Sequence, residues 1–248
     1  MRPTLEFDQV YYRYAGQKKY ALDGLTLTLP PGENIALIGR NGAGKSTFFL
    51  HCNGLYRPQA GQVRFAGQPL LYERQALKQL RRHVGIVFQN ADDQLFSASV
   101  AQDISFGPLN LGLSQAEARH RVQMAADLCN IADLLDRPTH ALSGGEKARV
   151  ALAGVLAMDP DILISDELLS SLDPWVRLRM LDIFAQLRER GKTVIMATHD
   201  LKVVRRWASY VVVMDAGRAA FAGTPEHLLA DQVLLTQTGL AQVWDGEI

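Results

Sequence analysis

The chain has 248 residues, of which 48% are hydrophobic and 21% charged, so its composition fits one large folded domain and excludes a disordered chain. Its 26 Lys and Arg residues are matched by 26 Asp and Glu residues, and the net charge predicts no attraction to nucleic acid or an anionic membrane. The apolar runs are far shorter than the roughly 20 residues that span a bilayer, so we expect no membrane span. The first ten residues do not resemble a secretory signal, and Cys52 and Cys129 form no CxxC pair, which favours the reducing cytoplasm.

The predicted strands and helices indicate an α/β fold. Residues 5–10 and 25–29 alternate apolar and polar positions, which is typical of antiparallel strands, and Asp23-Gly24 predicts a turn before the second strand. Three later runs are continuously apolar, which predicts buried strands of a parallel sheet, and each precedes a helical segment. Strands that alternate with helices predict a doubly wound sheet. The strand and helix pairs are 34–38 with 45–52, 162–165 with 174–190, and 193–197 with 201–207.

Between the first two of these strands lies a predominantly helical region. Its helical periodicity is strongest over 114–130 and 146–158, and it has few strand signals. A last strand is predicted over 210–214, and Thr224-Pro225 then begins a helix with a Thr cap. We therefore expect one domain over 1–248, made of an α/β core with an N-terminal β element at 1–88 and 161–248 and an inserted helical subdomain at 89–160.

A glycine-rich segment follows the predicted strand 34–38. It matches the phosphate-loop pattern GxxxxGK[ST] between a strand and a helix, the context in which that pattern binds nucleotide phosphates. Glycines let successive backbone N–H groups point at phosphate oxygens, and the helix start adds the positive end of its dipole. Lys45 is expected to neutralise the β- and γ-phosphates, Ser46 to bind Mg²⁺ through its hydroxyl, and Thr47 to contact the α-phosphate region. The predicted nucleotide-binding residues of the loop are Gly39, Arg40, Asn41, Gly42, Ala43, Gly44, Lys45, Ser46 and Thr47.

Two acids follow the apolar run 162–165. A pair of acids at a strand end is usually just solvated, but a phosphate loop elsewhere in the chain gives these two a chemical task. Asp166 is expected to hold Mg²⁺, directly or through water, and Glu167 to polarise the water that attacks the γ-phosphate. Neighbouring residues on a strand point in opposite directions, so one carboxylate cannot easily perform both tasks.

His199 follows the apolar run 193–197, where a parallel strand delivers side chains to a ligand crevice. A lone histidine is more often structural, but its place at a strand end beside a phosphate site favours a contact with the γ-phosphate. The other five histidines have no metal-ligand spacing, and we assign them no role.

A second glycine pair precedes the helical run 146–158. Ser143 is a predicted N-cap, and Glu146, three residues later, completes a capping box. Capping does not explain Gly144 and Gly145, which lower helix stability but expose backbone N–H groups to an incoming anion. We therefore expect a second phosphate-binding element here.

At these residues the sequence resembles the ATP-binding cassette (ABC) ATPases. Residues 142–146 read LSGGE, the signature motif of that family, and they accompany the phosphate loop, Asp166-Glu167 and His199 in the family's order and spacing. The resemblance covers nearly the whole chain and implies a P-loop NTPase core, ATP hydrolysis with ATP and Mg²⁺, and a head-to-tail dimer. The residues of one subunit that would close on the γ-phosphate held by the other are Ser143, Gly144, Gly145 and Glu146.

Three further residues match positions of the family. Gln89 matches the glutamine that senses Mg²⁺, which implies that it acts as a metal ligand and a catalytic group. In the family this glutamine leads into the lobe that contacts the membrane partner. Tyr14 best matches the aromatic residue that stacks on adenine, with Tyr11 and Tyr12 as alternatives. Asp173 matches the loop that communicates between the two ATP sites.

One segment departs from the family. Leu168-Leu169 stands where the family usually has Pro-Thr. Neither position supplies a catalytic group, so we expect altered loop stiffness and retained hydrolysis, with slow or partner-dependent turnover as the alternative.

The segments 88–96 and 103–110 resemble the ATPase subunits of energy-coupling-factor importers, most of all the cobalt/nickel type. This resemblance implies a peripheral protein at the cytoplasmic face of the cell membrane. The implied partners are a second ABC ATPase subunit, a transmembrane coupling subunit and a substrate-binding membrane subunit.

The same region offers a docking surface. We expect Leu95 and Phe96, exposed beside Asp92 and Asp93, to receive a coupling helix that carries apolar and basic residues. On physical grounds alone, an ordinary solvated loop is the alternative.

Other functions explain less of the sequence. A DNA-associated ABC ATPase needs a long coiled coil, and the chain has no sustained heptad run. A translation-factor ATPase needs two cassettes, and a small-molecule kinase would leave Ser143, Gly144 and Gly145 unexplained. Among importers, a vitamin importer is the alternative to a cobalt or nickel importer. We expect no nucleic-acid partner, and we favour a homodimer over a heterodimer.

Overall fold

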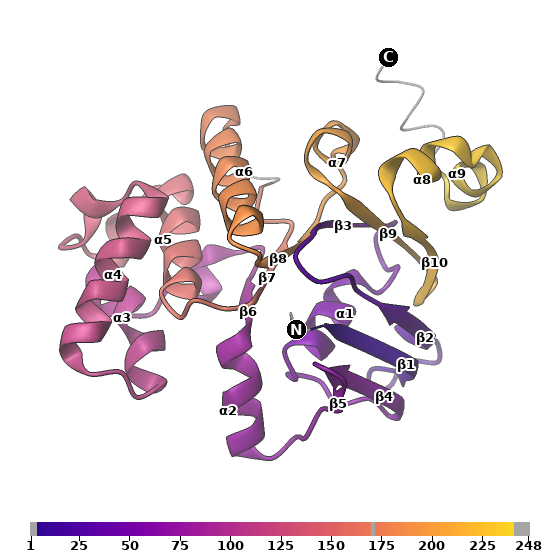
Figure 1. The fold of residues 1–248 in the computed structure, drawn as a ribbon, viewed down its shortest axis with the longest axis horizontal. Helices are drawn as coiled ribbons and strands as arrows, with labels where there is room; N and C mark the ends of the chain where they lie inside the picture. Colours follow the sequence, from indigo (N-terminus) through magenta and orange to yellow (C-terminus); the bar gives the residue numbers. More distant parts are fainter. Residues whose placement is uncertain (1–3, 170–171, 241–248) are drawn as a thin grey trace.

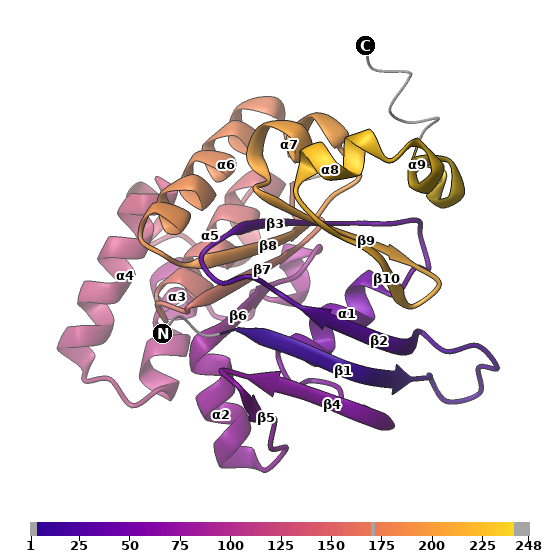
Figure 2. The same ribbon diagram turned by 45° about the vertical axis from the view of Figure 1, so that its right-hand side comes forward.

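The computed structural model describes residues 4–169 and 172–240. This part of the chain contains a four-stranded antiparallel sheet and a six-stranded mixed sheet, which lie one below the other (Figure 1, Figure 2). A group of helices extends beyond one edge of the mixed sheet, and other helices cover its far side (Figure 1). The predicted α/β core with an antiparallel β element and a helical lobe is confirmed.

The mixed sheet contains the parallel strands that the sequence predicts. Its order is β10-β9-β3-β8-β7-β6, in which all neighbours are parallel except the edge strand β10, which is antiparallel to β9. Parallel strands end at the same edge of a sheet, so the segments that follow β3, β6, β7 and β8 meet there. The strands are β3 (Asn34–Ile38), β6 (Val84–Val87), β7 (Ile162–Asp166), β8 (Thr193–Ala197), β9 (Tyr210–Asp215) and β10 (Arg218–Gly223).

The antiparallel sheet has the order β2-β1-β4-β5. Helix α1 (Lys45–Cys52) lies between the two sheets, because Phe48 and Phe49 share one buried cluster with side chains of both. Helix α2 (Arg74–His83) links this sheet to β6. The strands are β1 (Leu5–Tyr12), β2 (Leu22–Thr28), β4 (Ala60–Phe65) and β5 (Gln68–Pro69).

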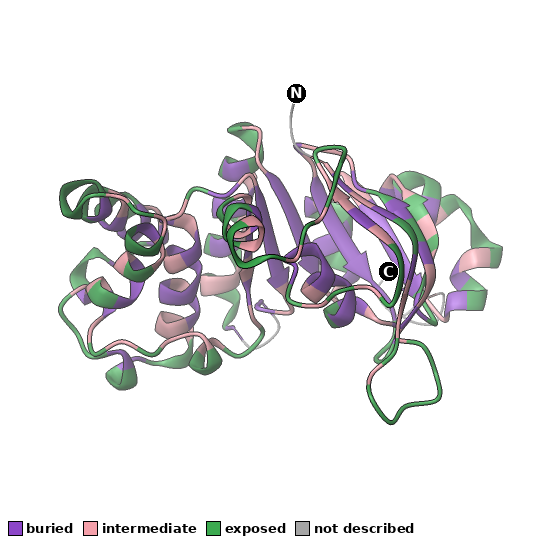
Figure 3. Cartoon of the chain, turned by 90° about the horizontal axis from the view of Figure 1, so that it is seen from below, coloured by how far each residue is buried: buried purple, intermediate pink, exposed green. Residues whose placement is uncertain are grey.

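The central strand β3 is buried on both faces. Ile35 and Leu37 belong to the cluster around α1, whereas Ala36 and Ile38 pack against the helices on the opposite side. Figure 3 shows that buried residues dominate the strands, while exposed residues gather on the outer faces of the helices. The covering helices are α7 (Leu201–Trp207), α8 (Pro225–Ala230) and α9 (Gln232–Thr238). The two-sided burial explains why β3 reads as one continuous apolar run.

The helical lobe is formed by α3 (Val100–Asn110), α4 (Gln115–Cys129) and α5 (Gly144–Leu156). Its core is continuous with the side chains under α6 (Pro174–Glu189). Between Gln89 and Pro160, a range that the structure describes throughout, the only regular elements are helices. The exact subdomain boundaries at 88/89 and 160/161 stay a prediction.

The predicted turn at Asp23-Gly24 is wrong, because both residues lie inside β2. Val10 pairs with Leu25 and Tyr11 pairs with Asp23, so Gly24 is an extra residue in a β-bulge. Its φ is +68, and a Cβ there would lie 2.8 Å from the Tyr11 hydroxyl oxygen, which explains the glycine.

Several elements give no clear sequence signal. Helix α3 contains Gly107-Pro108, a pair that normally argues against a helix interior. A Cβ at Gly107 would lie 2.7 Å from the Met158 side chain, so the glycine permits the close packing of α3 on the end of α5. The other elements not predicted are β4, β5, α2, β10 and α9.

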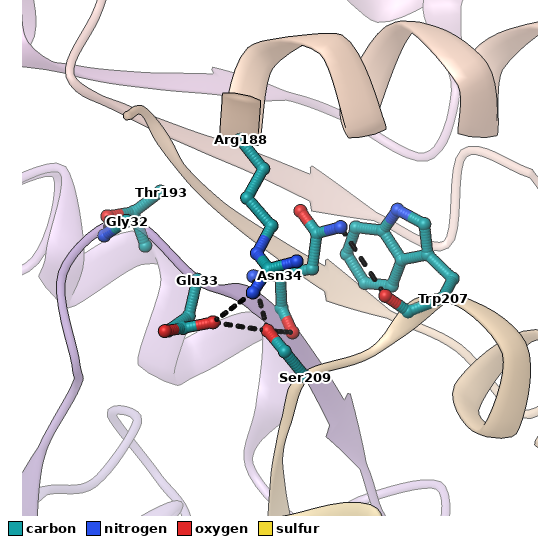
Figure 4. A network of polar contacts seen from close by, with 7 residues as sticks. All are labelled: Gly32, Glu33, Asn34, Arg188, Thr193, Trp207 and Ser209. Carbon is teal, nitrogen blue, oxygen red and sulfur yellow. Dashed lines mark hydrogen bonds and ion pairs between the residues drawn. The ribbon is translucent and has the colours of Figure 1, made fainter. Parts of the chain in front are cut away.

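A polar network fastens the start of β3 to the helices beside it (Figure 4). The Ser209 hydroxyl donates to Glu33 Oε2 at 2.5 Å, and Arg188 Nη2 donates to the same oxygen at 3.1 Å. The backbone N–H of Asn34 donates to Ser209 Oγ at 3.1 Å. The network therefore ties α6, the start of β3 and the segment before β9 together.

We expect Ser209→Ala to lower the free energy of unfolding by about 1 to 2 kcal/mol, because it leaves the backbone N–H of the buried Asn34 without its acceptor. Urea unfolding followed by circular dichroism measures the change. Ser105→Ala is the control, because the Ser105 hydroxyl donates within its own helix to Gln102. Equal losses in the two variants would contradict the role of the network.

Among the residues that the structure describes, the helices are too short or too polar to cross a bilayer.

Candidate functional site

The phosphate loop joins β3 to α1, as the sequence predicts. Gly42 and Gly44 have φ angles of +81 and +102, in the left-handed region that glycine tolerates. A Cβ at Gly39 would collide with the Met214 carbonyl oxygen. Helix α1 begins without a side-chain cap, so its first N–H groups are free of side-chain acceptors and suited to an anion.

The remaining loop residues take different positions. Ala43 is buried, whereas Asn41 is exposed and lines the cavity beside the loop. Arg40 is exposed, and its guanidinium packs against Gly239 at the end of α9. A Cβ at Gly239 would collide with this guanidinium.

Lys45 is buried in the first turn of α1, with 7% of its surface exposed. Its Nζ donates to the Gly39 carbonyl oxygen at 2.8 Å and lies 3.6 Å from Glu167 Oε1. The ammonium group therefore lies between the phosphate loop and the acidic end of β7, where it can approach a bound phosphate.

Asp166 is the last residue of β7, and its carboxylate accepts a hydrogen bond from the Ser46 hydroxyl. Burial raises the pKa of this carboxyl, the bond from Ser46 opposes that rise, and the nearby Glu167 charge adds to it. A cation beside Asp166 would relieve this unfavourable burial of charge.

Glu167 has left the strand, and its φ of +49 lies in the left-handed region, which is unusual for a glutamate. Its Oε1 lies 2.7 Å from His199 Nε2, and its Oε2 accepts from Gln89 Nε2 at 3.5 Å. Asp166 and Glu167 thus contact different partners, and a backbone turn at Glu167 rather than the predicted strand alternation separates them. Their separate roles stay a prediction.

His199 lies between β8 and α7 and is half exposed. Its Nε2 is 3.5 Å from Lys45 Nζ in addition to its contact with Glu167. The ends of β3, β6, β7 and β8 therefore bring Lys45, Gln89, Glu167 and His199 into one cluster.

A cavity of about 940 Å³ opens beside this cluster, and Tyr14 lines it. The Tyr14 hydroxyl lies 3.0 Å from Thr47 Oγ1. The alternative Tyr12 instead stacks on Tyr56 at 4.9 Å, and neither it nor Tyr11 lines the cavity. Tyr14 is the one residue of the β1–β2 loop that the sequence analysis identified, although the adjacent lysines of this loop were a further signal. The other cavity-lining residues of the loop are Gln17, Lys18, Lys19, Tyr20 and Ala21.

The second glycine pair lies elsewhere on the surface. Ser143 and Glu146 form the predicted capping box at the start of α5, and the bonds from Ser143 lower the pKa of the Glu146 carboxyl. A Cβ at Gly144 would meet open space, and Gly145 lies near the start of α6, where Asp173 is the N-cap. None of these five residues lines the cavity beside the phosphate loop.

Leu168 and Leu169 follow the acidic pair and are buried, with 1% and 6% of their surfaces exposed. They join the hydrophobic cluster that contains the helical lobe and α6. The two leucines that depart from Pro-Thr therefore anchor this segment in the core beside Glu167.

A groove of about 630 Å³ lies between α2 and α3, away from the phosphate loop. Phe96, 65% exposed, lines it and contacts Phe106 edge to face at 4.7 Å. The expectation that Leu95 is exposed is wrong: it is partly buried and packs on the core of the lobe. Asp92 is exposed, but Lys147 Nζ donates to its carboxylate at 2.5 Å.

The residues around the phosphate loop fit a magnesium ion that is bound chiefly through a nucleotide. Ser46 and Asp166 offer a hydroxyl and a carboxylate in contact with each other, and Gln89 lines the same cavity as Ser46. Within residues 4–169 and 172–240, no three His, Cys, Asp or Glu side chains cluster as a metal cage. Mg²⁺ typically takes one or two protein oxygens and completes its shell with water and phosphate.

The chain is similar to known transport ATPases. A family model described as "ABC transporter" matches residues 22–170. The cobalt import ATP-binding protein CbiO of Rhodobacter capsulatus is 47% identical over 97% of this chain and 85% of its own length. The energy-coupling factor transporter ATP-binding protein EcfA of Methanoculleus marisnigri is 46% identical over 95% of this chain and 84% of its own length. The solved structure of cbiO1 from Clostridium perfringens is described as part of the ABC transporter complex cbiONQ. It is 40% identical, the match covers 95% of this chain and 94% of cbiO1, and the two superpose with a TM-score of 0.82.

The family match spans more than half of the chain, and it contains the phosphate loop, the glycine pair after Ser143 and the Asp166-Glu167 pair. The chain therefore belongs to the ABC transporter family, as one of its ATP-binding, ATP-hydrolysing subunits.

Proposed function

We propose that this chain is the ATP-hydrolysing motor of an energy-coupling-factor importer that takes up cobalt or nickel ions at the cell membrane. The observation that carries the proposal is the cluster of Lys45, Glu167 and His199 at the strand ends, in a chain 47% identical to a cobalt import ATP-binding protein. A vitamin importer is the second candidate, because the identity to EcfA is almost as high at 46%.

The residues of the cluster divide the reaction among them. The backbone N–H groups of the phosphate loop and the Lys45 ammonium would bind the β- and γ-phosphates. Glu167 would accept a proton from the attacking water, and His199, in contact with Glu167, would contact the γ-phosphate. Ser46, Asp166 and Gln89 would hold Mg²⁺, which supplies charge neutralisation at the phosphates. Tyr14 would stack on adenine from the side of the cavity.

The second glycine pair points to a second copy of the chain as the partner. Ser143, Gly144 and Gly145 lie at the start of α5, where backbone N–H groups can bind an anion, yet they do not line the cavity of their own chain. A partner subunit would present these residues to the γ-phosphate, and Asp173, near Gly145, would contact the partner's site. We infer a homodimer that closes on two ATP molecules.

The groove between α2 and α3 is the proposed docking site for a transmembrane coupling subunit, which would in turn hold a substrate-binding membrane subunit. Phe96, Phe106 and Met158 give it an apolar lining next to the segment that begins at Gln89. This arrangement would connect the docked partner to the catalytic cluster through Gln89 and would hold the chain peripherally at the cytoplasmic face.

We expect Phe96→Ser to weaken assembly with the membrane subunits by about tenfold or more, because a large exposed aromatic in a groove supplies much of a docking energy. Co-purification and ATP-driven uptake measure the loss. Met124→Ser, a similarly exposed apolar residue on α4, is the control. Unchanged assembly in Phe96→Ser would show that the groove is not the docking site of the coupling subunit.

Transport in membrane vesicles tests the proposed substrate. The chain and the membrane subunits encoded with it would be reconstituted and supplied with ATP and radioactive cobalt, nickel or a vitamin mixture. Uptake of cobalt or nickel that stops with Glu167→Gln supports the proposal. Uptake of a vitamin alone favours the vitamin importer. If cobalt, nickel and vitamins all stay outside the vesicles, both candidate functions are contradicted.

A further inference from the structure

Arg177 lies outside the residues assigned so far, yet it joins two segments of the nucleotide site. It lies in α6, four residues after Asp173, and its Nη1 donates to Asp200 Oδ2 at 3.1 Å. Asp200 directly follows His199. The ion pair therefore connects the start of α6 to the link that carries the histidine.

Both carboxylate oxygens of Asp200 are engaged. Oδ1 accepts from two backbone N–H groups in the first turn of α7 at 3.0 and 3.2 Å, and Oδ2 accepts from Arg177. The Asp200 N–H donates to Thr198 Oγ1 at 3.0 Å, and the Thr198 N–H donates to the Leu37 carbonyl oxygen at 3.2 Å. Contacts on both sides of His199 therefore fix its backbone: Leu37 of β3 holds Thr198, and Arg177 of α6 holds Asp200.

The ion pair is partly withdrawn from water. The side chains of Arg177 and Asp200 are 31% and 34% exposed, and the Arg177 Nε atom is buried. The two residues share a cavity of about 320 Å³ with Glu167 and His199. Partial burial strengthens an ion pair relative to one at an open surface.

The start of α6 also lies beside Gly145 of the second glycine pair. Asp173 Oδ1 accepts from the N–H groups of Trp175 and Val176 at 3.0 and 3.1 Å, which fixes the start of the helix. A Cβ at Gly145 would lie 3.6 Å from the Val176 side chain. The start of α6 thus contacts the second phosphate-binding element on one side and, through Arg177, the histidine link on the other.

We propose that Arg177 is a positioning residue for ATP hydrolysis: through Asp200 it holds His199 against Glu167 and transmits displacement of the α6 start to the histidine. The inference rests on the proposed function, because it assumes that His199 and Glu167 act on the γ-phosphate. Misplacement of a catalytic contact by a fraction of an ångström to 1 Å lowers the rate of chemistry while leaving the phosphate-loop contacts to ATP intact.

Single and double substitutions test the coupling. Arg177→Ala is expected to lower kcat by about tenfold or more and to change the KM for MgATP by less than about twofold. Asp200→Asn keeps a side-chain oxygen to cap α7 but loses the charge that binds Arg177, and it should have the same effect. The double variant should be no slower than the slower single variant, because both remove one interaction. Arg177→Lys should restore part of kcat.

Arg64→Ala is the matched control, because Arg64 forms an exposed ion pair with Asp8 far along the chain from the histidine link. If the unmodified chain and Arg64→Ala hydrolyse ATP while Arg177→Ala and Asp200→Asn keep normal kcat, the positioning role is wrong and the proposed function stands. Additive losses, or losses matched by a fall in Tm, would also overturn it. If the unmodified chain hydrolyses ATP neither alone nor in complex with the membrane subunits, the proposed function itself fails. If Arg177→Ala does not fold, the kcat of Asp200→Asn tests the positioning role by itself: a loss of about tenfold supports the role, and a normal kcat contradicts it.

Discussion

Glu167→Gln is expected to bind MgATP with nearly normal affinity and to hydrolyse it about 10² to 10⁴ times more slowly. The glutamine preserves the shape of the side chain but cannot accept a proton from water. Lys45 and His199 lie 3.6 and 2.7 Å from the Glu167 carboxylate, and both can still contact the phosphates. Phosphate release and a nucleotide-binding titration on the same preparation separate the loss of chemistry from any loss of binding.

The matched control for this variant is Glu189→Gln, at the exposed end of α6. That substitution removes the same charge at a distance from Lys45 and His199, and it should leave turnover unchanged. Near-normal turnover in Glu167→Gln would remove Glu167 from its assigned role, and the contact with His199 would then be structural.

Lys45→Ala is expected to weaken ATP binding by about a hundredfold or more, because charge-assisted hydrogen bonds to phosphate contribute about 1.5 to 3 kcal/mol each. The 7% exposure of Lys45 leaves water little access to compensate for the missing ammonium. Isothermal titration with ATP measures the affinity, and the unfolding temperature checks that the fold is retained.

Lys78→Ala serves as the control for charge, because Lys78 lies on α2 at the groove and away from the phosphate loop. Its affinity for ATP should equal that of the unmodified chain. An unchanged affinity in Lys45→Ala would contradict the assignment of the phosphate loop.

The buried parallel core was predictable because the strands that carry the site are apolar along most of their length. The predicted bounds of β3, α1, β8 and α7 agree with the structure. The failures lie where tertiary contacts override local signals. Gly24 looks like a turn but forms a bulge opposite Tyr11, and Gly107-Pro108 looks like a break but lies inside α3 against Met158.

The meeting of the candidate site residues was predictable in part, because parallel strands bring the residues that follow them to one edge of the sheet. Lys45, Gln89, Glu167 and His199 meet as the strand order requires. Arg177 could not be found in this way, because its contact with Asp200 depends on how α6 packs beside α7 rather than on a strand end. The burial of Leu95 was missed for a similar reason, since its neighbours are hydrophobic residues of the lobe core.

The central claim is that two copies of the chain share each nucleotide. The most direct measurement is the mass of Glu167→Gln in solution with saturating MgATP, by light scattering coupled to size exclusion, alone and combined with Ser143→Arg. We predict twice the 27.4 kDa mass of one chain with ATP, and loss of this ATP-dependent form when Ser143→Arg blocks the glycine pair. A single chain that remains 27.4 kDa while saturated with ATP would contradict the claim.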